Sequence, residues 1–101
     1  MDEIPITYSG IHHLTTTEKE DFEITAKSDA ERTSRHIPTI QSFQIHVKTI
    51  QKTGGRKYYT IELHAKTGRS IETVSSEDWD MRKAIRQAFT EMKKREEKRK
   101  K

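Results

Sequence analysis

Three side chains in the middle of the chain, His46, Glu62 and His64, are of the types that perform acid–base chemistry. If their segments form neighbouring strands, all three point from the same outer face of a sheet. Two imidazoles and a carboxylate are what a metal-independent ribonuclease could use as acid and base. They are equally typical of an open, polar sheet face, so a nuclease is the least favoured interpretation. The chain has no cysteine, which excludes thiolate nucleophiles and Cys-based metal sites, and we expect neither a metal nor a cofactor.

Basic side chains are the second chemical feature, and they are concentrated toward the C-terminus. Residues 81–101 carry ten basic and three acidic side chains, whereas residues 1–40 carry four basic and eight acidic ones. A basic segment of this kind favours a polyanionic partner such as RNA. The alternative is that the cations only keep a terminal segment soluble.

An amphipathic helix is predicted to display these cations. Ser75 or Ser76 is the expected N-cap, and no apolar residue follows Met92. We therefore expect one folded domain over residues 1–94 and a basic, disordered tail over residues 95–101. The apolar stripe of the helix comprises Met81, Ala84, Ile85, Ala88, Phe89 and Met92.

The outward side of this helix is predicted to carry a row of cations. Arg82, Arg86 and Lys93 share one exposed side, and Lys83 and Lys94 lie beside it. RNA phosphates would find a continuous positive surface there.

Alternating and periodic apolar residues predict the first part of the fold. Residues 4–8 alternate as a short strand, in which Pro5 favours an edge position. Thr17 and Glu20 have the spacing of a capping box for a first helix, which Pro38 ends. The inner face of this helix comprises Phe22, Ala26, Ala30, Thr33 and Ile37.

Residues 43–47 and 59–65 alternate on both sides of two consecutive glycines, which predicts a β-hairpin. Because the inward residues of both strands have odd numbers, paired residue numbers must sum to an even value. We therefore expect a three- or five-residue connection and a sum of 108 or 110. A sum of 110 would place His46 directly opposite His64.

A turn at Thr67-Gly68-Arg69 and a short last strand over residues 70–74 complete the order β-α-β-β-β-α. The first two strands are expected to be parallel through a right-handed crossover, and the last three to form a meander. The predicted fold class is α+β, a two-layer sandwich with two helices packed on one face of a four-stranded sheet.

The chain has 101 residues, of which 36% are charged and 30% hydrophobic, which limits it to one small core. It has no apolar run near the length of a membrane span, and its first residues lack an export signal. We expect a cytoplasmic protein with no membrane partner and no small-molecule substrate.

The element order, together with Ile6-Thr7-Tyr8-Ser9-Gly10, resembles the family of ribosome hibernation promoting factors, also called ribosome-associated inhibitors or sigma 54 modulation proteins. Residues 80–94 look like the family's Asp-Met, Ala-Ile and Ala-Phe helix with a Lys/Arg-rich end, and residues 40–48 are similar to its second strand. The first helix departs from the family in lacking leucines, and residues 67–69 stand where the family often has Gly-Gly. The chain looks like the short form, without a dimerising domain.

This resemblance implies a non-enzymatic factor that binds the small ribosomal subunit in the channel for mRNA and tRNA and silences translation. It implies a monomer off the ribosome, and loop cations that help to hold rRNA. A general double-stranded or structured RNA-binding module is the alternative. The residues expected to bind rRNA are Arg82, Lys83, Arg86, Lys93, Lys94, Lys48, Lys66 and Arg69.

Overall fold

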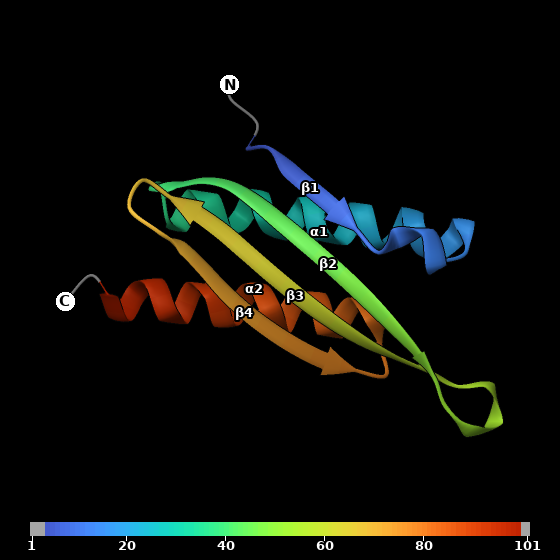
Figure 1. The fold of residues 1–101 in the computed structure, drawn as a ribbon. Helices are drawn as coiled ribbons and strands as arrows, with labels where there is room; N and C mark the ends of the chain where they lie inside the picture. Colours follow the sequence, from blue (N-terminus) through green and yellow to red (C-terminus); the bar gives the residue numbers. More distant parts are fainter. Residues whose placement is uncertain (1–3, 100–101) are drawn as a thin grey trace.

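Two helices cover one face of a four-stranded sheet and leave the other face open (Figure 1), in a computed structural model that describes residues 4–99. The strand order is β1-β2-β3-β4, with β1 parallel to β2 and the later pairs antiparallel. The predicted fold class and the edge position of the first strand are therefore confirmed. The elements are β1 (Ile6–Ser9), η1 (Ile11–His13), α1 (Thr16–His36), β2 (Ile40–Gln51), η2 (Thr53–Gly55), β3 (Lys57–Thr67), β4 (Ile71–Asp78) and α2 (Met81–Arg99).

The core lies between the sheet and the two helices. Every residue of the two predicted helix faces is buried, and the side chains of Phe22, Ile85 and Ala88 are fully covered. The ring of Phe43 on β2 meets that of Phe89 on α2 edge to face, with centroids 5.4 Å apart. The apolar stripe of α2 thus fixes which side of the helix faces outward. Within residues 4–99, neither helix is long and apolar enough to cross a membrane.

The hairpin register follows the lower of the two expected sums. Val47 faces Ile61, so paired residue numbers sum to 108, and the pairing of Gln51 with Lys57 leaves a five-residue connection. The sum of 110 was wrong, because Gly54 and Gly55 both adopt positive φ and close the longer connection.

The first helix is capped two residues earlier than expected. The capping box is formed by Thr15 and Glu18, not by Thr17 and Glu20. The carboxylate of Glu18 also accepts a hydrogen bond from the hydroxyl of Tyr59 on β3, so the observed cap is tied to the sheet.

The second helix begins later than expected because β4 continues to Asp78. Ser75 and Ser76 belong to this strand and are not N-caps. Asp80 takes that role, since its Oδ1 accepts hydrogen bonds from the backbone N–H groups of Arg82 and Lys83 at 2.9 and 3.4 Å. Strand pairing has therefore overridden the serine capping signal.

The helix α2 continues through Arg99, beyond the expected domain boundary at residue 94. Arg95 donates a hydrogen bond to the backbone oxygen of Thr73 at 2.8 Å, and Glu96 is buried. These residues are part of the helix and not of a disordered tail. The bond from Arg95 also occupies a carbonyl of β4, which is an edge strand. Residues 100 and 101 lie outside the described residues.

Glu18 links the first turn of α1 to the sheet through charge as well as hydrogen bonds. Lys57 Nζ lies 3.2 Å from its Oε1, and the Thr15 N–H donates to the same oxygen. Burial alone would raise the pKa of Glu18, but the hydrogen bonds from Thr15 and Tyr59 and the ammonium of Lys57 lower it to about 2. The folded state therefore favours the ionised carboxylate.

This lowered pKa predicts an acid-dependent loss of stability. Because the pKa of Glu18 falls from 4.5 to about 2 on folding, its contribution is fully present above pH 4.5 and is lost between about pH 4.5 and 2. The full shift would correspond to about 3 kcal/mol, and solvent screening of this half-buried carboxylate makes the loss smaller than that. We expect Glu18→Gln to remove this part of the pH dependence, as measured by urea unfolding at a series of pH values. Glu20→Gln, at an exposed neighbour, is the control, and an energy difference between wild type and Glu18→Gln that stays constant with pH would contradict the assignment.

Candidate nucleic-acid interface

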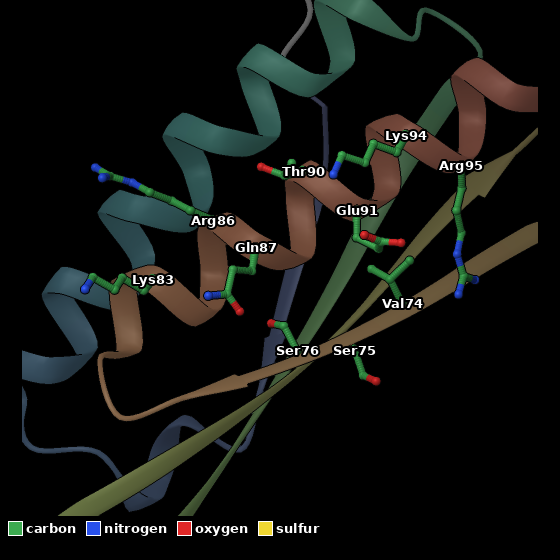
Figure 2. Close-up of a pocket in the computed structure, with 10 residues that line it drawn as sticks. All are labelled: Val74, Ser75, Ser76, Lys83, Arg86, Gln87, Thr90, Glu91, Lys94 and Arg95. Atoms are coloured by element: carbon green, nitrogen blue, oxygen red, sulfur yellow. The ribbon is translucent and has the colours of Figure 1, made fainter.

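An open groove of about 600 Å³ runs between α2 and the edge strand β4 (Figure 2). One wall is formed by successive turns of α2, and the other by the middle of β4. The groove is lined by Val74, Ser75, Ser76, Lys83, Arg86, Gln87, Thr90, Glu91, Lys94 and Arg95.

Helical spacing explains why these α2 residues share one side. Lys83, Gln87, Glu91 and Arg95 follow one another at steps of four, which keeps them in one row along the helix. The row stands beside the buried stripe, so these side chains emerge where the helix meets the edge of the sheet. Figure 2 shows Lys83 at one end of the groove and Arg95 reaching over β4 at the other.

The charge of the groove is predominantly positive. Its lining has four cations, Lys83, Arg86, Lys94 and Arg95, and one carboxylate, Glu91. The hydroxyls of Ser75 and Thr90 add neutral polar groups, whereas the Ser76 hydroxyl donates to the Ala84 carbonyl and the Gln87 amide to Asp78. An open groove with this chemistry can bind successive phosphates of an RNA backbone.

The cations on the other side of α2 face the parallel helix α1. Arg82 Nη2 lies 3.0 Å from Asp21 Oδ1. Asp29 is buried, which raises its pKa, while the charges of Arg32, Arg86 and Lys93 oppose that rise. In Figure 2 the side chain of Arg86 points toward α1. The expected row of Arg82, Arg86 and Lys93 is therefore not a set of free cations, because acidic residues of α1 lie against it.

The remaining cations that the sequence singled out do not line the groove. Lys48 and Lys66 are exposed on the open face of the sheet, and Arg69 is exposed in the turn between β3 and β4. They lie on or beside the open face of the sheet, outside the lining of the groove.

His46 and His64 on the open sheet face form hydrogen bonds with different partners. His46 lies opposite Glu62 in the register, and its Nδ1 is 2.8 Å from Ser9 Oγ. His64 Nε2 is 2.9 Å from Glu62 Oε1, and its Nδ1 is 2.8 Å from Thr73 Oγ1. The two imidazoles are therefore not a directly opposed pair. Within residues 4–99, no three His, Cys, Asp or Glu side chains are grouped to hold a metal ion.

Sequence reasoning missed several groove residues. The absence of apolar residues after Met92 places Arg95 in the tail, and the hydroxyls of Ser75 and Ser76 indicate a helix cap, so neither pattern predicts a position in the groove. The step of four from Lys83 through Gln87 to Arg95 was the signal that could have placed Arg95 on the same side. Nothing in the sequence indicated which strand edge would face that side.

The architecture defines a small α+β protein with a cation-lined groove at the edge of its sheet. The family model described as Sigma 54 modulation protein / S30EA ribosomal protein matches residues 6–101. The chain belongs to this family of ribosome-associated proteins, as the sequence resemblance indicated.

Solved structures show the same fold. A ribosomal subunit interface protein from Coxiella burnetii has 16% sequence identity and a TM-score of 0.73, with 96% of this chain and 98% of that chain covered. The N-terminal domain of Protein Y from Thermus thermophilus has 15% identity and a TM-score of 0.57, with coverage of 93% and 94%. A comparison with curated proteins found no match.

Proposed function

We propose that this protein binds the rRNA of the small ribosomal subunit in the channel used by mRNA and tRNA, and that it silences translation by occupying that channel. It performs no chemistry and acts in the cytoplasm, where it finds ribosomes. Family membership supports the ribosome as partner. The name of the Coxiella burnetii relative, a ribosomal subunit interface protein, supports a position between the subunits.

The observation that carries the proposal is the groove between α2 and β4. Its cations project from a helix whose other side is fixed in the core, so phosphate binding requires little ordering of the backbone. RNA phosphates bound there release condensed counterions, and affinity falls steeply with salt. For six phosphate contacts to duplex-like RNA, the log–log slope is roughly −4 to −5.

Cations outside the groove extend the proposed contact. Lys48, Lys66 and Arg69 are exposed and lie on or beside the sheet. Arg82 and Lys93 contribute at the side next to α1, where Asp21 and Asp29 reduce the positive potential. We therefore expect Lys83 and Lys94 to carry more of the affinity than Arg82.

Sucrose-gradient sedimentation tests the proposed function. With small subunits in molar excess at low salt, the protein should move with them, and raising the salt should return it to the top. The same assay with a long RNA duplex distinguishes a general RNA-binding module, which would bind the duplex as tightly as it binds the subunit. Protein that remains at the top of the gradient in low salt would refute the proposal.

A further inference from the structure

A row of apolar side chains crosses the open face of the sheet, away from the helices and the core. Ile50 on β2 pairs with Tyr58 on β3, and Trp79 directly follows Asp78, which pairs with Tyr59. The rings of Tyr58 and Trp79 are in contact, with centroids 4.9 Å apart and planes at 67°. Trp79 is 44% exposed and Ile50 is 37% exposed. The row therefore presents aromatic surface to solvent.

Two cations of the hairpin connection lie against these rings. The guanidinium carbon of Arg56 is 4.2 Å from the centroid of the Trp79 ring, and Lys52 Nζ is 5.9 Å from that of Tyr58. Lys48 is exposed on the same face, two residues before Ile50. Glu77 lies opposite Thr60 nearby, so cations outnumber acids around the rings.

We propose that Tyr58 and Trp79 form a stacking platform for an unpaired base of RNA, and that Arg56 and Lys52 bind the phosphates beside that base. Exposed aromatic rings stack on any base, and adjacent cations hold the backbone that connects successive bases. The platform rests on the proposed function, because it deepens how the same RNA partner is recognised. It adds contacts to single-stranded RNA on the sheet face that the helices do not cover.

The charge around the rings favours RNA over a protein as the partner of this surface. Exposed apolar side chains could bind either kind of partner, but the two cations at the rings, Arg56 and Lys52, match the negative charge of a phosphate backbone. The groove on α2 has the same preference, and both surfaces border β4. One RNA that passes around this strand could therefore reach both.

Trp79 is the only tryptophan of the chain, so its fluorescence reports on the platform directly. We expect a 12-nucleotide oligouridylate to quench it, and an abasic RNA backbone of equal length to leave it nearly unchanged. Trp79→Ala should weaken oligouridylate binding roughly 5- to 150-fold, measured by anisotropy of labelled RNA. Trp79→Phe should retain most of the affinity. Ile71→Ala is the matched control, since Ile71 is 63% exposed on the same sheet face, and it should bind like wild type.

Equal quenching by the abasic backbone, or wild-type affinity in Trp79→Ala, would overturn the platform. Circular dichroism checks that Trp79→Ala is folded, which its exposure predicts. Sedimentation with small subunits separates the two proposals. Trp79→Ala that keeps both its oligouridylate affinity and its ribosome association overturns only the platform. Wild-type protein that stacks on oligouridylate but ignores ribosomes supports the platform and refutes the proposed function.

Discussion

Replacing Lys83 and Lys94 together by glutamate should weaken ribosome binding by about 100-fold at low salt, or about tenfold for each reversed charge. Both side chains are exposed in the groove, and no core contact depends on them. Lys83 lies in the first turn of α2, where a glutamate interacts favourably with the helix N-terminus. The log–log salt slope should become shallower by about 1.5 to 2. Sedimentation and filter binding over a salt series measure both effects.

The matched control is Lys19→Glu with Arg35→Glu on α1. This double variant changes the net charge by the same amount as the double replacement on α2. Lys19 lies near the start of α1 and Arg35 near its end. These positions do not line the groove, so binding should fall only by the small effect of net charge. Equal losses in the two double variants would show that total charge, and not the groove, determines binding.

Gly10→Ala should destabilise the fold by about 3 kcal/mol or more. Gly10 adopts φ +77°, and a Cβ added there would lie 2.1 Å from the backbone oxygen of Val47 on β2. An L-residue at this position must therefore both strain its own backbone and displace the strand. Urea unfolding followed by circular dichroism measures the change.

Gly54→Ala separates strain from collision. Gly54 has almost the same backbone conformation, φ +81°, but nothing lies within 4 Å of an added Cβ. It should cost only about 1 kcal/mol. Equal losses of stability in the two variants would mean that the chain after β1 relaxes away from Val47. The requirement for glycine at residue 10 would then come from its positive φ and not from the close approach to Val47.

Periodicity allowed most of the fold to be predicted. The inward residues of the hairpin strands and of both helices are buried because alternation and helical spacing directly encode which side is apolar. The choice between sums of 108 and 110 could not be made, since both preserve this parity. It depends on how Gly54 and Gly55 close the connection, which alternation does not encode.

Less of the candidate site than of the fold could be predicted from the sequence. The position of Lys83 and Lys94 on α2 follows from its apolar stripe, but the pairing of Arg82 with Asp21 depends on how the two helices pack. Apolar periodicity ends at Met92 and therefore gives no position for Arg95. A hydrogen bond to Thr73 places it at the edge of β4, and no local pattern predicts that contact.

The unequal charges of α1 and α2 have a consequence for how the molecule approaches a polyanion. Residues 16–36 include six acidic and four basic side chains, whereas residues 81–99 include three acidic and eight basic ones. Since the helices lie side by side (Figure 1), the layer they form has an electric dipole directed across it. The field of a polyanion exerts a torque on such a dipole and turns α2 forward before contact. Collisions in the wrong orientation thereby become rarer, and added salt removes this advantage beyond about 10 Å.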